Sequence, residues 1–214
     1  KRQWMNNPES QMVAVTVRAG SKAEMALPDG TFVHLNAATN LEYDVNNSKQ
    51  RLVKLSGEAF FDVAKNPDCP FKVIINDLQI EVVGTSFNVK TYKKDIVETS
   101  LLSGRIRISG GSLPHEYTLS PGQKATYSAM DRTLRISKAD AHVEAGWRDN
   151  YLIFESTPLI DVIAQIERWY GVEIRLHHKQ IAQDLLSGSF RNESIQNVIR
   201  SLSCLLYTSD AADD

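Results

Sequence analysis

Residues 23–35 read Ala-Glu-Met-Ala-Leu-Pro-Asp-Gly-Thr-Phe-Val-His-Leu. Side chains of alternating polarity flank the central Pro28-Asp29-Gly30 segment, which is the pattern of strands with one buried face. Proline presets its own φ and glycine tolerates a positive φ, so these three residues favour a tight turn. The stretch therefore predicts a β-hairpin.

The same alternation recurs over most of the chain. The predicted strands lie at residues 13–17, 23–27, 31–35, 51–55, 58–63, 71–75, 80–83, 87–89, 97–101, 105–108, 117–119, 124–127 and 134–136. No helical periodicity of comparable strength interrupts residues 13–145. We therefore predict a mainly β fold, with an all-β sandwich, roll or solenoid in this region, whose strand order the pattern leaves open.

The pattern changes near Trp147, where a short apolar strand is predicted at residues 151–154. Thr157-Pro158 then places an N-cap residue before a proline at the first helical position. Apolar side chains recur at helical spacing as far as Tyr170, and Gly171 is expected to end the helix.

The remaining elements complete a second, smaller module. They are predicted as a strand at 172–176, a strand at 188–190 and a helix at 195–202. The order β-α-β-β-α predicts a compact α/β module over residues 146–203.

Bulk properties argue against two classes of protein. The 214 residues carry a formal net charge of −2, and lysine and arginine are scattered along the chain. A nucleic-acid-binding protein needs a basic surface to replace phosphate counterions, so this class is disfavoured. The sequence also contains no run of about 20 apolar residues of the kind that spans a bilayer.

Metal ligands are not grouped in a recognisable way. The adjacent pair His177-His178 would point to opposite faces of a strand and could not readily share one ion. Cys69 and Cys204 lack the spacing of a zinc site. We predict no metal and no other cofactor.

Signatures of catalysis are also weak. Gly84-Thr85-Ser86-Phe87-Asn88 resembles a nucleophile elbow but lacks the second glycine and leads into a strand, so we interpret it as a strand connection. Glu58 and Asp62 share one strand face, about 13 Å apart, which exceeds the spacing of a glycosidase pair. We interpret these two carboxylates as part of a solvated face and predict that the protein is not an enzyme. An extracellular glycan-binding β module remains the alternative function.

Six motifs follow one another along the chain, namely Leu27–Thr31, Leu35–Ala37, Gly57–Ala64, Pro70–Val73, Val83–Val89 and Leu119–Ala125. Together they resemble the periplasmic domain of FecR-type anti-sigma factors, in a form common in Bacteroidota. A second set looks like the C-terminal domain of that family, which is similar to the short N-terminal domain of secretins and TonB-dependent receptors. This set comprises Trp147, Phe154, Pro158-Leu159, Val162 and Ile166–Tyr170.

The resemblance implies a signalling role. Such a regulator sits in the inner membrane, and its cytoplasmic domain holds an extracytoplasmic-function sigma factor. Its periplasmic region contacts the signalling domain of an outer-membrane TonB-dependent transducer, without a small-molecule substrate. By this resemblance residues 1–12 are a linker that follows the membrane helix, and the sigma factor is reached only through a cytoplasmic domain outside this chain.

Two further expectations follow from the resemblance. If the second module pairs with its partner by strand addition, the outward side chains beside the predicted strands would make the contact, namely Arg175, His177 and Arg191. Residues 204–214 depart from the family, which continues into closing strands. We expect them to be a foreign or disordered tail that leaves the second module incomplete.

Overall fold

The computed structural model describes residues 11–44, 51–177 and 179–210. Two seven-stranded sheets form the first part of the fold. Sheet A has the order β1 (Met12–Val17), β4 (Thr39–Asp44), β5 (Arg51–Ser56), β7 (Phe71–Ile75), β8 (Leu78–Val82), β11 (Ile106–Gly110) and β12 (Tyr117–Leu119). Sheet B has the order β14 (Thr133–Lys138), β13 (Gln123–Ser128), β10 (Ile96–Ser103), β9 (Ser86–Lys90), β6 (Glu58–Asp62), β3 (Phe32–Leu35) and β2 (Ala23–Ala26).

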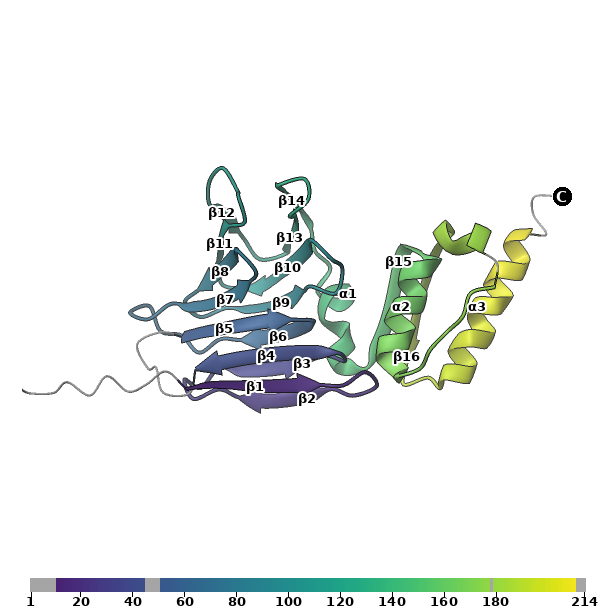
Figure 1. The fold of residues 1–214 in the computed structure, drawn as a ribbon, viewed down its shortest axis with the longest axis horizontal. Coiled ribbons are helices and arrows are strands. Elements are labelled where there is room, and N and C mark those ends of the chain that lie inside the picture. Colours follow the sequence, from purple (N-terminus) through teal and green to yellow (C-terminus); the bar gives the residue numbers. More distant parts are fainter. Residues whose placement is uncertain (1–10, 45–50, 178, 211–214) are drawn as a thin grey trace, which may run out of the picture.

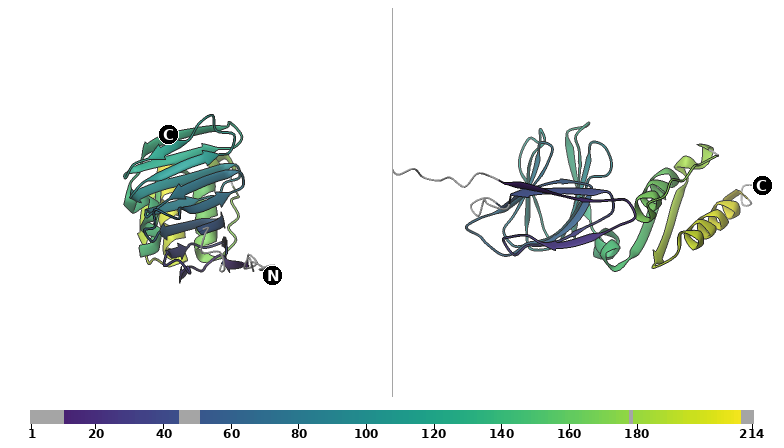
Figure 2. Two further views of the ribbon diagram at one scale, coloured as in Figure 1. Left: turned by 90° about the vertical axis from the view of Figure 1, so that its left-hand side faces the viewer. Right: turned by 60° about the horizontal axis from the view of Figure 1, so that its bottom comes forward.

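The two sheets lie face to face, and the chain passes back and forth between them from β1 and β2 at one end to β12 and β14 at the other (Figures 1 and 2). Strands β5 and β7 pair in parallel, because β6 lies in the opposite sheet, whereas the other ladders are antiparallel. The predicted mainly β fold, followed by a small α/β module, is confirmed. We call β1–β14 the β module.

The core of the β module lies between the sheets. Phe61 and Phe87 of sheet B stack with ring centroids 5.2 Å apart, and Phe71 of sheet A lies 5.8 Å from Phe61. All three rings are buried in one continuous apolar cluster. In strand 58–63 the face opposite Glu58 and Asp62, which carries Phe61, does point into this core.

The hairpin predicted at residues 23–35 is present as β2 and β3, which pair from Ala23–Leu35 to Ala26–Phe32. Gly30 has φ +84°, and its N–H donates to Leu27 O at 3.0 Å. The hairpin was predictable because its turn chemistry is entirely local. Strand β4, which we did not predict, completes sheet A between β1 and β5.

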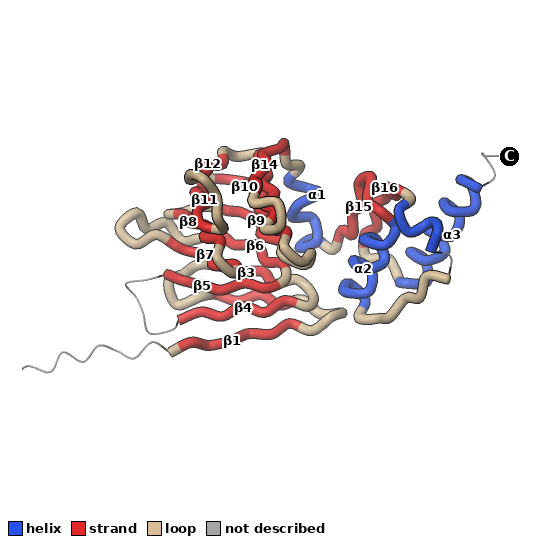
Figure 3. The backbone as a smooth tube through the Cα atoms, turned by 45° about the horizontal axis from the view of Figure 1, so that its top comes forward, coloured by secondary structure: helices blue, strands red, loops and turns tan. Residues whose placement is uncertain are grey.

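A short connector follows β14. It consists of helix α1 (Ala141–Ala145) and the 3₁₀ helix η1 (Gly146–Asp149). The connector lies beside sheet B, between that sheet and the rest of the chain (Figures 1 and 3).

The α/β module comprises β15 (Tyr151–Pro158), α2 (Leu159–Tyr170), η2 (Lys179–Gln183), β16 (Leu185–Arg191) and α3 (Ile195–Asp210). Strands β15 and β16 pair in an antiparallel two-stranded sheet. Gly171 ends α2 in the left-handed conformation, with φ +68°, as expected from its position. The module has its own apolar core, to which Val162, Ile166 and Val198 contribute fully buried side chains.

Three predictions in the second module are corrected. Residues 172–176 form no strand, because the Ile174 N–H donates to the Glu167 carboxylate at 2.7 Å instead of joining a ladder. The order is therefore β-α-β-α. Helix α2 starts one residue later than expected, with Pro158 at the N-cap, because the Thr157 hydroxyl donates to Glu155 O within β15.

Residues 204–210 belong to α3, which continues through Asp210. The expectation that this segment is foreign to the family stays a prediction. Residues 211–214 lie outside the described residues. In the part of the chain that the structure describes, no helix is both long and apolar enough to cross a membrane.

Candidate functional site

The junction between the β module and the α/β module holds a cluster of buried polar side chains, formed by Asn36, Glu58 and Asn88. The connector places Trp147 on the outer face of sheet B, where it packs with Phe60 and Ala145 in a small apolar core. The guanidinium carbon of Arg148 lies 3.6 Å from the centre of the Phe60 ring. This face of β6 is therefore covered by the connector.

Glu58 lies at the centre of this covered face. Its side chain is buried, with 6 % of the residue exposed, so the expectation of a solvated carboxylate is wrong for Glu58, whereas Asp62 is exposed. Asn36 Nδ2 donates to one carboxylate oxygen at 2.8 Å, and Asn88 Nδ2 donates to the other at 3.0 Å. Burying a carboxylate is costly unless such donors replace its water.

The same network reaches the connector. Trp147 Nε1 donates to Asn88 Oδ1 at 3.1 Å. The side-chain amide of Asn88 thereby links Trp147 to Glu58. The side-chain amide of Asn36 links Glu58 in turn to the loop after β3. Asn36 Oδ1 in turn accepts from the Ala37 N–H at 2.8 Å. We call this chain of hydrogen bonds the Glu58 network.

Lys22 makes a second link. It stands just before β2, and its ammonium donates to Trp147 O at 2.6 Å and to Asn150 Oδ1 at 3.0 Å. The same nitrogen lies 3.6 Å from the centre of the Trp169 ring on α2, which is a close cation–π contact. Burial lowers the pKa of Lys22 to about 8, and the charge of Glu58 partly opposes this shift.

Backbone contact makes a third link, between the β1–β2 turn and the end of α2. The Gly20 N–H donates to Arg168 O at 2.8 Å. A Cβ atom on Gly20 would lie 3.3 Å from Gly171 Cα, and one on Gly171 would lie 3.1 Å from Ala19 O. Both glycines also have positive φ, so this close approach depends on them.

Arg168 of α2 and Tyr92 of the β module pack against each other at one side of the junction. The guanidinium carbon of Arg168 lies 4.1 Å from the centre of the Tyr92 ring, and the Tyr92 hydroxyl donates to Ala37 O. Burial raises the pKa of Tyr92 and lowers the pKa of Arg168. Burial therefore favours the neutral phenol of Tyr92.

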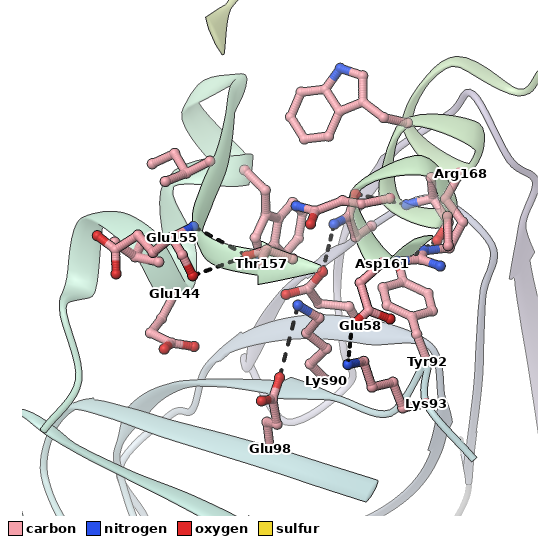
Figure 4. Close-up of a pocket in the computed structure, with 18 of the residues that line it drawn as sticks. Glu58, Lys90, Tyr92, Lys93, Glu98, Glu144, Glu155, Thr157, Asp161 and Arg168 are labelled. Carbon is pink, nitrogen blue, oxygen red and sulfur yellow. Dashed lines mark hydrogen bonds and ion pairs between the residues drawn. The ribbon is translucent and has the colours of Figure 1, made fainter. Parts of the chain in front are cut away.

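Above these contacts lies a cleft of about 510 Å³ lined by β6, β9, β10, the connector, β15 and α2 (Figure 4). Lys93 and Asp161 face each other across it at 2.6 Å. A second pair, Lys124 and Glu144, joins β13 to α1 at 2.9 Å, and Lys124 also lies 3.3 Å from Glu98. Acidic and basic side chains of the cleft thus pair with each other, and the Lys93–Asp161 pair joins the β module to α2.

The cleft does not have the features of a glycan-binding groove. Sugars stack on aromatic rings, but cations of the chain lie over three of the rings at the junction. Lys22 lies over Trp169, Arg168 over Tyr92, and Arg191 over Tyr151 at 4.8 Å. The glycan-binding alternative therefore gains no support from this site.

Other candidate chemistry resolves into structural roles. Thr85 Oγ1 donates to Arg105 O at 3.1 Å, and Ser86 Oγ donates to Asp62 at 2.8 Å, so Gly84-Thr85-Ser86 is the strand connection that we inferred. A Cβ on Gly84 would lie 2.9 Å from Lys65 Cα, which explains the glycine. Among the described residues, no group of three or more histidine, cysteine or acidic side chains is placed to hold a metal ion.

The three predicted contact residues all lie on the surface of the α/β module. Arg175 is highly exposed and pairs with Glu173 at 3.1 Å, and His177 follows in the same irregular segment. Arg191 ends β16 and lies over Tyr151. The structure places Arg175 and His177 outside any strand, and the partner-binding role of the three residues stays a prediction.

Sequence reasoning missed the Glu58 network and Lys22. One signal was present: the face of β6 assigned to solvent also carries Phe60, a large apolar side chain that a solvated face disfavours. Nothing local marks Lys22, because its partners Trp147, Asn150 and Trp169 lie more than a hundred residues away in sequence.

Comparisons with known proteins agree with this architecture. The family model described as FecR protein matches residues 13–107, and the model described as FecR, C-terminal matches residues 151–206. Two crystal structures of a candidate anti-sigma factor from Parabacteroides distasonis ATCC 8503 are similar over both modules. One is 30% identical with a TM-score of 0.81, covering 89% of this chain and 90% of the other. The second is 30% identical with a TM-score of 0.82, covering 90% of each chain. No curated protein matches the chain.

Proposed function

The chain belongs to the FecR family of anti-sigma regulators, and from this premise we propose that it is the signal-receiving region of such a regulator. The observation that carries the proposal is the order of the two family matches, 13–107 and then 151–206, within one structural likeness that spans both modules. The likeness therefore extends to the junction as well as to each module.

The proposed signal is a protein contact made in the periplasm. The partner is the signalling domain of an outer-membrane TonB-dependent transducer, and the output passes to an extracytoplasmic-function sigma factor through a cytoplasmic domain outside this chain. No reaction, small-molecule substrate or nucleic acid takes part. The pairing of junction groups with one another supports a role without a small-molecule ligand, as in Trp147 with Asn88, Lys22 with Trp147 and Lys93 with Asp161.

The α/β module is the proposed contact surface. Its sheet has two strands, so each strand has one edge that the ladder between β15 and β16 does not use. Unused strand edges are natural templates for strand addition. Near one end of this sheet, Ile160 and Leu185 expose apolar side chains beside the Pro158–Leu185 pair. A partner strand would gain both backbone hydrogen bonds and apolar contact there.

Binding of purified transducer domains tests the proposal. We expect the chain to bind the signalling domain of at least one TonB-dependent receptor from the same source in isothermal titration calorimetry. The failure of every such domain to bind would overturn the proposed partner.

Variants test the proposed contact residues separately. Arg175→Ala, His177→Ala and Arg191→Ala should each weaken binding by about 0.5–1 kcal/mol, because exposed charges at an interface rim contribute little individually. Arg135→Ala in β14 is the matched control, since Arg135 is an exposed arginine on the β module. Unchanged affinity in all three variants would show that these residues do not contact the transducer domain. That result would not contradict the transducer domain as the proposed partner.

A further inference from the structure

We infer that the junction holds the α/β module in a single orientation on sheet B, and that Lys22 and Trp147 are the residues that set this orientation. The two modules then move as one rigid body. The use of this rigidity in signalling rests on the proposed function, but the rigidity itself does not depend on any partner.

The first support is the distribution of the links. One runs from the β1–β2 turn to the end of α2 through Gly20 and Gly171. Another runs from Lys22 to Trp147 in η1 and to Asn150, which follows η1. The same side chain also contacts Trp169 on α2. The third runs from Trp147 into strands β9 and β6. Contacts on separate elements restrict rotation, whereas a single contact would leave a hinge.

The second support is the direction dependence of the contacts. The apolar core of Phe60, Ala145 and Trp147 holds the surfaces together but tolerates sliding, since the hydrophobic effect is not directional. The hydrogen bonds of Lys22 and Trp147 have fixed partners and lie in partly or fully buried surroundings, where a misplaced polar group is costly. The Gly20–Gly171 approach leaves little room for sliding of the backbones.

The third support is that one residue joins two of the links. Trp147 donates through its indole to Asn88 in the β module and accepts through its carbonyl from Lys22. Lys22 in turn lies over Trp169 of α2. A displacement of α2 therefore acts through Lys22 and Trp147 on Asn88, and thus on the strand that lies between β6 and β10.

Distances between paired spin labels test the inference without any partner. We would label Arg135 in β14 and Ser189 in β16, both exposed, in a chain whose two cysteines are replaced by serine. The parent chain should give one narrow distance distribution. Lys22→Met with Trp147→Phe removes the ammonium and the indole donor but keeps most of the apolar volume, and it should broaden the distribution.

Controls separate loss of orientation from loss of folding. Glu42→Gln with Lys54→Met removes a 3.9 Å ion pair on sheet A, far from the junction, and should leave the distribution narrow. Far-ultraviolet circular dichroism checks that the variants keep their strands. Lys22→Met alone, at a partly exposed site, is a second variant that should perturb the fold less than the double variant. A broad distribution in the parent chain, or an unchanged one in both Lys22→Met and the double variant, would overturn the inference. Failure of the transducer domains to bind would refute only the proposed function.

Discussion

Trp147→Phe isolates one hydrogen bond of the junction. The substitution keeps an aromatic ring but removes the Nε1–H that donates to Asn88 Oδ1 at 3.1 Å. Trp147 and Asn88 are both buried, so the acceptor is left without its donor. An unsatisfied buried polar group costs about 1–3 kcal/mol, and we expect the free energy of unfolding to fall by that amount.

Urea denaturation measures this fall. We expect a lower midpoint with an unchanged slope, because the surface exposed on unfolding stays the same. For a chain of this size each kcal/mol lowers the melting temperature by about 2–4 °C. Trp147→Ala should cost about 3–5 kcal/mol, since it also removes the packing of the ring.

Met130→Ala is the control, because Met130 is 81% exposed and its truncation should change stability by at most about 0.5 kcal/mol. If Trp147→Phe matches the parent chain within that error, the indole hydrogen bond does not stabilise the fold. If Trp147→Ala costs no more than Trp147→Phe, the ring is not packed as the structure shows. Either result would refute the reasoning for this residue.

Three other predictions concern the same junction. Gly171→Ala should destabilise by about 1 kcal/mol or more in thermal unfolding, because φ is +68° and the new Cβ would lie 3.1 Å from Ala19 O; an unchanged melting temperature would contradict this close approach. Because burial lowers the pKa of Lys22 to about 8, the ammonium of Lys22 loses its proton at a lower pH in the folded chain than in the unfolded chain. The Lys22 contribution to the free energy of unfolding should therefore rise between about pH 8 and about pH 10.5, and a Lys22→Met variant with the same pH dependence in urea titrations would show that another group is responsible. Lys93→Ala should lower the free energy of unfolding by only about 0–1 kcal/mol, less at high salt, since 59% of the Lys93 side chain and 30% of the Asp161 side chain are exposed. A loss above about 2 kcal/mol would show that this pair holds the modules together.

Period-two alternation predicted the β module well because it reports which side chains face the core. The face of strand 58–63 opposite Glu58 and Asp62, which carries Phe61, does point into the core, and the turn at Gly30 followed from local backbone preferences. Alternation cannot show that a second layer covers the outer face. For that reason Glu58 was assigned to solvent although the connector buries it.

The errors in the α/β module have a different cause. Residues 172–176 alternate like a strand, and Ile174 does turn toward the core of the module, yet the segment has no ladder. Strand formation depends on a neighbouring strand, which the sequence of the segment does not specify. The junction was equally hidden, because Lys22 and Trp169 come together only after both modules have folded.

The order of strands in the β module also has a consequence for how the chain is made. Each sheet adds its strands in nearly the order in which they are synthesised, from β1 and β2 toward β12 and β14. A growing chain can therefore pair each new strand with one already in place, and both sheets lengthen together. Pairing between distant parts of a chain slows folding and prolongs the exposure of apolar surface. In this topology each new strand pairs with one that comes shortly before it in the sequence, so sheet B can form before the connector packs on it.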